Sequence, residues 1–224
     1  MRQQTVFLFD LDGTLVDSVY QHVLAWRAAL DAEGIPLSVW RIHRKIGMSG
    51  GLFTNQLGRE IDMEMDQARL DRMRKVHADT YNQIANQIRP LPGAVELLAA
   101  LDTAEIPWAI ATSGRMETAR PNLLALGVDP DKSVVITRDM VKYAKPDPDL
   151  FLAAAERLGA PIETAVVVGD SIWDMLAAAR CRALGVGLLS GGYGQDELER
   201  AGALRVYEDP LDMLNHLDEV GGRR

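Results

Sequence analysis

The stretch Val6-Phe7-Leu8-Phe9-Asp10-Leu11-Asp12-Gly13 decides the fold of this chain. Its first four residues form a short, continuously apolar run, which is typical of a strand buried on both faces of a parallel sheet. Asp10 and Asp12 follow, and two carboxylates separated by one residue point to the same side of an extended chain. Gly13 has no Cβ, so the backbone there can turn close to a ligand. We therefore expect a polar site at the end of this strand.

Similar apolar runs recur along the chain, and helical periodicities separate them. This alternation predicts an α/β fold, a doubly wound parallel sheet. The polar residues that follow each run would then meet at the carboxyl edge of the sheet, where ligands bind in such folds. The further strands are expected at residues 108–111, 134–136, 165–168 and 186–189, and the helices between them at residues 94–101, 116–126, 149–158 and 172–183.

One long interval breaks the alternation. Between residues 16 and 89 no strand is evident, and helical patterns dominate at residues 20–30 and 63–88. The sequence Pro90-Leu91-Pro92-Gly93 then stops the helical pattern sharply. We expect residues 16–89 to form a small all-helical cap domain over the active edge of the sheet. Residues 1–15 and 90–224 would form the α/β core domain.

The composition narrows the classes of partner. The 224 residues include 24 Lys and Arg against 32 Asp and Glu, a formal net charge of −8. This balance argues against nucleic acid and anionic membranes as partners, because phosphate-rich surfaces are bound by clustered cations. A small phosphorylated metabolite stays compatible, because a metal ion and a few local cations can outweigh the global field. The single Cys181 excludes an intrachain disulfide. We expect a cytoplasmic protein, either a monomer or a homodimer.

The carboxylates after the first strand predict a metal site. Asp10 and Asp12 would repel each other, and a hard cation such as Mg²⁺ relieves such repulsion while it binds phosphate and water as well. Asp170 follows the expected strand at residues 165–168 and completes the site if that strand neighbours the first. Asp174 lies one helical turn further on, where it can orient the metal's surroundings or simply cap the helix.

Two other strand ends offer groups that bind phosphate. Thr112 supplies a hydroxyl, and Ser113 and Gly114 supply backbone N–H groups ahead of a helix, which together suit an anion. Lys145 lies in a loop stiffened by prolines, where its charge can neutralise both a phosphate and a nucleophile.

These residues together resemble the motifs of the haloacid dehalogenase superfamily. The order and spacing of four motifs agree with that family, and the resemblance covers essentially the whole chain, with the helical segment similar to a C1-type cap. The second and third motifs are weak when taken alone, but the four together are specific. The matching segments are Phe9-Asp10-Leu11-Asp12-Gly13-Thr14-Leu15-Val16-Asp17-Ser18, Thr112, Lys145-Pro146 and Gly169-Asp170-Ser171-Ile172-Trp173-Asp174.

The resemblance implies a Rossmann-like core and a mechanism. Asp10 would be the nucleophile that attacks phosphorus, and Asp12 would be the acid and then the base for the two halves of the reaction. Lys145 would assist catalysis. Mg²⁺ would be held by Asp10, the backbone carbonyl of Asp12, and Asp170. Dehalogenases and phosphonate-cleaving members lack an aspartate at the position of Asp12, so its presence favours phosphate esters.

The cap contributes candidate substrate contacts. His22 and Trp26 lie on one face of the first cap helix. Their spacing from Asp10 along the sequence is similar to that in β-phosphoglucomutase and related sugar-phosphate phosphatases. Packing between the cap and the core explains them equally well. Arg44, Lys45 and Ser49 surround a glycine-rich turn that faces the substrate in such proteins. Basic residues in such a place are more often a solvated surface.

We expect a phosphatase that acts on a small phosphomonoester, a sugar phosphate or a compound like phosphoglycolate. A phosphoglucomutase-like phosphotransferase on the same site is the first alternative, and a non-catalytic binding relative is the second. A serine hydrolase is a remote option, because Gly47-Met48-Ser49-Gly50-Gly51 matches G-x-S-x-G but follows a basic segment in place of the required apolar strand.

Overall fold

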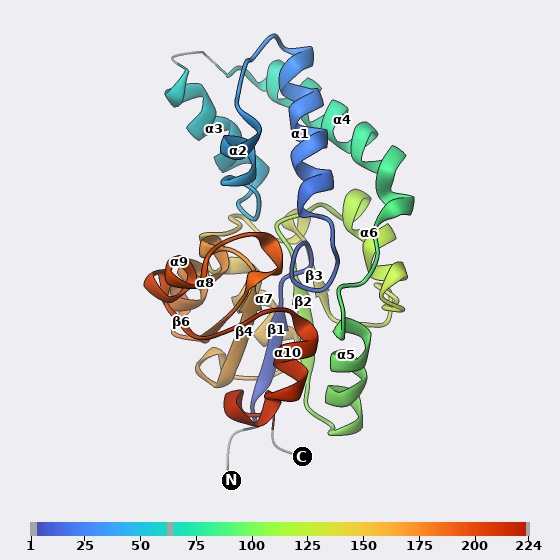
Figure 1. Cartoon of the computed structure of the whole chain (residues 1–224), viewed down its shortest axis with the longest axis vertical. Helices are drawn as coiled ribbons and strands as arrows, with labels where there is room; N and C mark the ends of the chain where they lie inside the picture. Colours follow the sequence, from blue (N-terminus) through green and yellow to red (C-terminus); the bar gives the residue numbers. More distant parts are fainter. Residues whose placement is uncertain (1–3, 62–64, 223–224) are drawn as a thin grey trace.

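The computed structural model describes residues 4–61 and 65–222, and a six-stranded parallel sheet lies at its centre (Figure 1). The strands lie in the order β3-β2-β1-β4-β5-β6, and each neighbouring pair is parallel. Their bounds are Val6–Phe9 for β1, Trp108–Ala111 for β2, Val135–Ile136 for β3, Ala165–Gly169 for β4, Leu184–Leu188 for β5 and Ala203–Tyr207 for β6.

The strand order reverses beside β1. The chain runs from β1 through β2 to β3 on one side and then crosses to β4 on the other side. Such a switch point opens a crevice at the carboxyl edge of an open parallel sheet. Phe9, the last residue of β1, lies opposite Ile110 of β2 and Val168 of β4. The residues that follow these three strands therefore meet at one place.

Helices cover both faces of the sheet, which explains why β1 is apolar at every position. Phe7 and Phe9 belong to a buried cluster with residues of α5, α6 and α10, whereas Val6 and Leu8 belong to a second cluster with residues of α7 and α8. The helices of this part of the chain are α5 Ala94–Thr103, α6 Met116–Ala125, α7 Asp149–Arg157, α8 Ile172–Cys181, α9 Gln195–Ala201 and α10 Pro210–Asn215, with short 3₁₀ turns η2 Arg138–Met140, η3 Ile162–Thr164, η4 Leu189–Gly191 and η5 Leu217–Val220.

Four helices follow β1 and form what we call the helical insert: α1 Val19–Ala32, α2 Val39–His43, α3 Gly50–Glu60 and α4 Gln67–Ile84, with a 3₁₀ turn η1 at Ala85–Gln87. The insert has an apolar cluster of its own, which includes Trp26, Leu30, Phe53 and Met73. Figure 1 shows these helices beyond the carboxyl ends of the strands, at one end of the molecule. The carboxyl edge of the sheet therefore faces the insert.

The α/β fold with a doubly wound parallel sheet is confirmed, and the differences lie in the individual elements. Strand β6 was not anticipated, because Arg205 interrupts its apolar residues and Leu204 is exposed at the edge of the sheet. Strand β5 begins two residues earlier than expected, since Gly185 is part of it and lies close to the Met175 side chain of α8. The expected helix start at Met63 lies outside the described residues.

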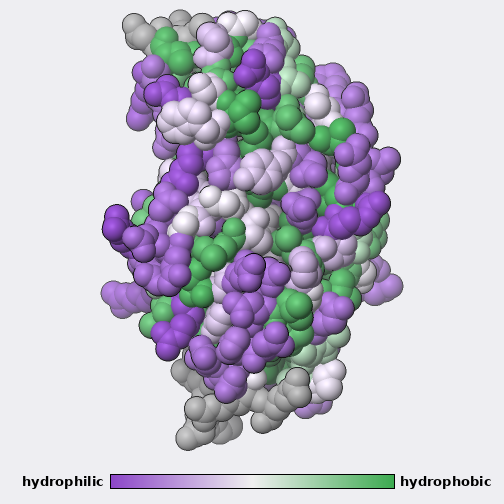
Figure 2. Space-filling model, viewed as in Figure 1, coloured by the Kyte–Doolittle hydropathy of each residue, from purple (hydrophilic) through white to green (hydrophobic). Residues whose placement is uncertain are grey.

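The surface carries both hydrophobic and hydrophilic side chains. In Figure 2 hydrophobic residues are interleaved with hydrophilic ones over the visible face. Among the helices that the structure describes, none is both long and apolar enough to cross a bilayer.

Candidate active site

The carboxyl edge of the sheet brings together a buried lysine and three buried carboxylates. Asp10 follows β1, Asp170 follows β4, and Asp174 lies in the first turn of α8. Nζ of Lys145 lies 2.5 Å from Oδ1 of Asp10 and 2.8 Å from Oδ1 of Asp174. All four side chains are almost completely shielded from solvent. Three carboxylates share one cation, and the charges near the strand ends are therefore unbalanced.

This imbalance appears in the acid–base properties of the cluster. Burial raises the pKa of Asp10 to about 7, against the opposing charge of Lys145. Burial and the neighbouring Asp174 raise the pKa of Asp170 well above its ordinary value. Burial disfavours the charge on Lys145, but the two carboxylates beside it outweigh burial and raise its pKa.

The cluster has the donor set of a divalent cation site. Asp10, Asp170 and Asp174 each offer an oxygen, and these oxygens lie within 4.8 Å of one another. Carboxylate oxygens suit Mg²⁺, and an added cation would relieve the excess of negative charge. The loops pack closely around Asp170: a Cβ on Gly191 would come 1.7 Å from its Oδ2, and Gly13, at a φ of 81°, would meet the same carboxylate. Glycine is therefore required at both positions.

Asp174 already has partners for both of its oxygens. Oδ1 faces Lys145, and Oδ2 accepts hydrogen bonds from the Oγ of Ser171 at 2.5 Å and from its backbone N–H at 3.2 Å. The second bond belongs to a capping box at the start of α8. The side chain that caps the helix thus also contacts Lys145.

One carboxylate oxygen of Asp12 accepts hydrogen bonds, and the other lies toward the turn after β2. Oδ1 accepts from the Oγ of Ser18 at 2.6 Å and from Nδ2 of Asn122 at 2.9 Å, and it lies 3.2 Å from Nε2 of His22. Oδ2 lies toward Gly114, on the side of the turn after β2. Burial opposes ionisation of Asp12, but His22 and the hydroxyl of Ser18 outweigh it and lower its pKa.

The turn after β2 can bind an anion. The backbone N–H of Gly114 donates to Oγ1 of Thr112 at 2.9 Å, so the proton of the Thr112 hydroxyl remains available to an acceptor. Within the described residues the buried Oγ of Ser113 has no hydrogen-bond partner. Thr112 and Ser113 thus offer donors beside Asp12, whereas the N–H of Gly114, which the sequence analysis assigned to phosphate, is already used inside the turn.

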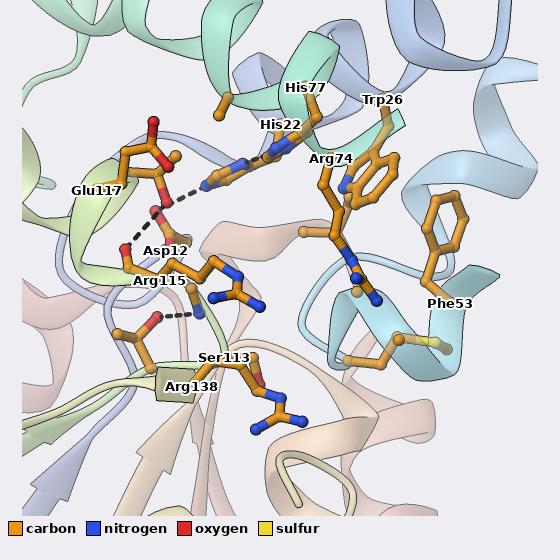
Figure 3. A pocket seen from close by; sticks show the side chains of 18 of the residues that line it. Asp12, His22, Trp26, Phe53, Arg74, His77, Ser113, Arg115, Glu117 and Arg138 are labelled. Carbon is orange, nitrogen blue, oxygen red and sulfur yellow. Dashed lines mark hydrogen bonds and ion pairs between the residues drawn. The ribbon is translucent and has the colours of Figure 1, made fainter. Parts of the chain in front are cut away.

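A cavity of about 500 Å³ joins this edge to the helical insert. Asp10, Asp12 and the turn at residues 112–114 line its floor, and residues of α1, α3 and α4 line the other side. Figure 3 shows the side chains of Arg74 and Arg115 extending into this space, with Trp26 and Phe53 at one wall. Arg138 also lines the cavity, but its guanidinium donates to the backbone carbonyls of Val141 and Lys142. The volume holds more than a phosphate group, so a small organic phosphate can be enclosed between the core and the insert.

The comparisons with known proteins agree with this geometry. A family model described as haloacid dehalogenase-like hydrolase matches residues 5–182. The chain belongs to this family. Among curated relatives, hexitol phosphatase A of Escherichia coli is 36% identical over 80% of this chain and 82% of its own. A phosphoglycolate phosphatase of Caulobacter vibrioides is 32% identical over 92% of this chain and 87% of its own.

Solved structures also resemble this haloacid dehalogenase-like hydrolase. The crystal structure of a hydrolase from Pseudomonas syringae has a TM-score of 0.96 and 63% identity, and the match covers 97% of this chain and 100% of the other. A β-phosphoglucomutase from Clostridium difficile has a TM-score of 0.85 and 20% identity over 97% of both chains, which shows a shared fold alone.

The candidate substrate contacts that the sequence indicates in the insert of this hydrolase differ from one another in their surroundings. His22 lines the cavity and contacts Asp12, and Trp26 lies beside it on α1. Lys45 also lines the cavity, but its Nζ is paired with Glu60 at 2.5 Å.

Arg44 and Ser49 are not brought into the cavity. The guanidinium of Arg44 pairs with Glu197 and lies 4.0 Å from the ring centroid of Tyr193, so this side chain joins the insert to the core. Ser49 caps α3, where its Oγ accepts from the backbone N–H of Leu52 at 3.3 Å. The turn of Ser49 follows helix α2 and a bend, not a strand, and thus lacks the context of a serine hydrolase elbow.

Several cavity residues were not found from the sequence. Arg115 and Arg138 each lie one or two residues after a recognised strand end or motif, so their positions in the chain were a usable signal. His77 and Arg74 lie on α4 in a strongly polar stretch, and only the packing of α4 against α1 shows that they face the cavity.

Proposed function

We propose that this chain is a Mg²⁺-dependent phosphatase that hydrolyses a small phosphomonoester through an aspartyl phosphate on Asp10. The observation that carries the proposal is the pairing of two unequal carboxylates at one strand end. Asp10 is buried against Lys145, whereas Asp12 keeps Oδ2 on the side of the Thr112–Gly114 turn. These surroundings support Asp10 as the nucleophile and Asp12 as the acid–base group.

The first half of the reaction moves the phosphoryl group to the protein. A carboxylate oxygen of Asp10 attacks phosphorus, the ester P–O bond breaks, and the leaving oxygen takes a proton from Asp12. Lys145 holds Asp10 in place and offsets negative charge on the transferring group. Thr112 and Ser113 donate to the phosphoryl oxygens.

The second half releases phosphate. A water molecule gives a proton to Asp12 and attacks phosphorus, and the bond between phosphorus and Asp10 breaks. Both halves use the same proton site on Asp12, so the acid is regenerated in each turnover. The insert limits access to the cavity, which favours a small substrate over a macromolecule.

Asp10, Asp170 and the backbone carbonyl of Asp12 would hold Mg²⁺. When bound, the ion offsets negative charge on the phosphoryl oxygens. The assignment of Asp170 is supported by its burial among carboxylates, where no cation of the described residues pairs with it. Asp174 acts indirectly, because Lys145 and Ser171 occupy its oxygens.

The substrate class is supported by the relatives and by the cavity. The relatives are named for a hexitol phosphate, phosphoglycolate and N-acetylmuramic acid 6-phosphate, all small phosphomonoesters. We propose a phosphorylated sugar or a related small acid as substrate, in keeping with a cavity of about 500 Å³.

The test is release of phosphate from p-nitrophenyl phosphate and a panel of sugar phosphates, phosphoglycolate and sugar-acid phosphates. It is run with Mg²⁺, with EDTA, and with Asp10→Asn. Asp17→Asn is the matched control, because Asp17 lies in the same segment but is exposed. We expect metal-dependent release that only Asp10→Asn abolishes. Isomerised phosphate ester without steady phosphate release would instead identify a phosphotransferase.

A further inference from the structure

A chain of contacts leads from Asp12 into the helical insert. His22 on α1 lies with Nε2 3.2 Å from Oδ1 of Asp12, and its other ring nitrogen, Nδ1, lies 3.1 Å from Nε2 of His77 on α4. Figure 3 shows the three side chains in this order. The proposed reaction assigns no role to His77.

The ring geometry is that of a hydrogen bond between two imidazoles. The ring planes of His22 and His77 are within 7° of parallel, and the centroids are 5.3 Å apart. The N–H and the lone pair of an imidazole lie in the ring plane, so two nearly coplanar rings that meet at their nitrogens are well aligned. The Tyr81 ring stacks on the His22 ring with centroids 4.0 Å apart, and the Trp26 ring packs against the His77 ring with centroids 4.5 Å apart. Both rings are therefore held in orientation.

The proton positions follow from the inventory of donors. A neutral imidazole has one N–H donor and one bare nitrogen. Oδ1 of Asp12 already accepts from Ser18 and Asn122, so His22 fits there as a third donor with its proton on Nε2. Nδ1 of His22 is then bare and needs a donor, and Nε2 of His77 is the nitrogen that faces it.

We propose that His77 is a positioning residue, which donates from Nε2–H to Nδ1 of His22 and thereby holds His22 as a donor to Oδ1 of Asp12. The proposal rests on the proposed function, in which Asp12 carries a proton that the leaving group must receive. Burial lowers the pKa of His77 to about 3, which keeps its ring neutral.

The arrangement decides which oxygen of Asp12 carries the proton. With Nε2 of His22 protonated, Oδ1 is surrounded by three donors, and a proton on the carboxyl group is left to Oδ2, toward Gly114. If His22 took the opposite tautomer, its bare Nε2 would accept a proton from Oδ1. That proton would then lie away from the turn at residues 112–114, where the substrate's phosphate is placed.

The first measurement locates the ring protons of the histidines, in the metal-free wild type and in His77→Leu. Side-chain ¹⁵N shifts from long-range ¹H–¹⁵N correlation spectra identify the tautomer of each histidine. We expect His22 to be protonated at Nε2 and bare at Nδ1 in the wild type, and a mixture of tautomers in His77→Leu. A wild-type His22 that is protonated at Nδ1, as either the other tautomer or an imidazolium, would overturn the proposal.

The second measurement compares variants on the substrate that the panel selects. His77→Gln keeps an N–H donor, whereas His77→Leu has a similar volume and none. Partners that orient the ligands of a metal site change activity by about 10- to 100-fold, and His77 would orient a side chain beside such a site. We therefore expect His77→Leu to lower kcat about tenfold with KM little changed, and His77→Gln to stay within about threefold of the wild type. His216→Leu, a substitution of an exposed histidine at the end of α10, serves as the control.

A double substitution separates positioning from packing. In His22→Gln the side chain can donate to Asp12 without any tautomer to fix, so adding His77→Leu should have no further effect on kcat. An equal loss in both backgrounds, or an equal loss for His77→Gln and His77→Leu, would contradict the proposal. Thermal unfolding of each variant shows whether the fold is intact. Full activity in Asp10→Asn would refute the aspartyl phosphate, but the tautomer measurement would still decide the role of His77.

Discussion

Nζ of Lys145 lies 2.5 Å from Oδ1 of Asp10, and both side chains are almost completely buried. The lysine is also 2.8 Å from Asp174, the side chain that caps α8. One buried cation thus connects the proposed nucleophile to the start of the helix after β4. Its removal would leave two carboxylates buried without compensation, which is costly in a protein interior.

We expect Lys145→Met to abolish phosphate release and to lower the free energy of unfolding by about 3 kcal/mol. Denaturant unfolding in EDTA measures the second effect, since bound metal would mask it. Lys142→Met, a change to a neighbouring exposed lysine, is the control. Unchanged stability of Lys145→Met would show that the ion pair contributes nothing to the fold.

Asp170→Asn should have opposite effects with and without metal. Burial and repulsion from Asp174 raise the pKa of Asp170, so removing its charge should raise the melting temperature in EDTA. The same change should remove the stabilisation by Mg²⁺, which for a wild type at 100 times its Kd is about 2.7 kcal/mol. Thermal unfolding with and without Mg²⁺ gives both values, and Asp218→Asn at an exposed site is the control. Full Mg²⁺ stabilisation of Asp170→Asn would exclude Asp170 as a ligand.

The stability of the metal-free protein should depend on pH through Asp10. Burial raises the pKa of folded Asp10 from 3.8 to about 7, so its contribution is fully present below about pH 4 and is lost as the pH rises through about 7. Comparison with Asp10→Asn isolates this group. The wild type should lose about 2 kcal/mol relative to the variant between pH 4 and 8 in EDTA, and less with Mg²⁺. A difference that does not vary with pH would contradict the raised pKa.

Glu33 should stabilise the insert by joining α1 to α4. Its carboxylate accepts from Arg69 at 3.0 Å and from Arg72 at 2.7 Å, and these bonds lower its pKa to about 2. The contribution is present above the ordinary pKa of 4.5 and is lost as the pH falls toward 2.

Glu33→Gln should therefore cost about 1 kcal/mol at pH 7 and almost nothing near pH 2, as measured by urea unfolding at both values. Asp79→Asn removes an exposed pair with Lys75 and should cost less at either pH. Equal losses in the free energy of unfolding for the two variants at pH 7 would mean that the pairs of Glu33 contribute no more than an exposed surface ion pair.

The core of the fold could be predicted because strands β1 to β5 each contain a local apolar run. The four residues of β1 are buried on both faces, so all are apolar, and the carboxylates that follow stand out. The register of β1 with β2 and β4 then brings Asp10, Thr112 and Asp170 together. Strand β6 has no such pattern, because Arg205 interrupts it and both Leu204 and Arg205 are exposed.

The insert was less predictable because its contacts join distant parts of the chain. Arg44 and Lys45 are adjacent in the sequence, but Arg44 turns to Glu197 and Tyr193 of the core, whereas Lys45 lines the cavity. His77 has no local signal either, since its importance comes from a nitrogen of His22 on another helix. Side-chain direction in short helices and turns depends on such partners, and no spacing rule supplies them.

The most direct test of the central claim is to trap the phosphoryl group on the protein. The enzyme is quenched during steady turnover and reduced with borohydride, which converts an acyl phosphate to an alcohol, and the peptide that contains residues 10, 12 and 17 is sequenced by mass spectrometry. We expect homoserine at position 10 in the presence of substrate and Mg²⁺, and unmodified aspartate at positions 12 and 17. Turnover with no reduced residue at position 10, or with the modification at another residue, would contradict the account.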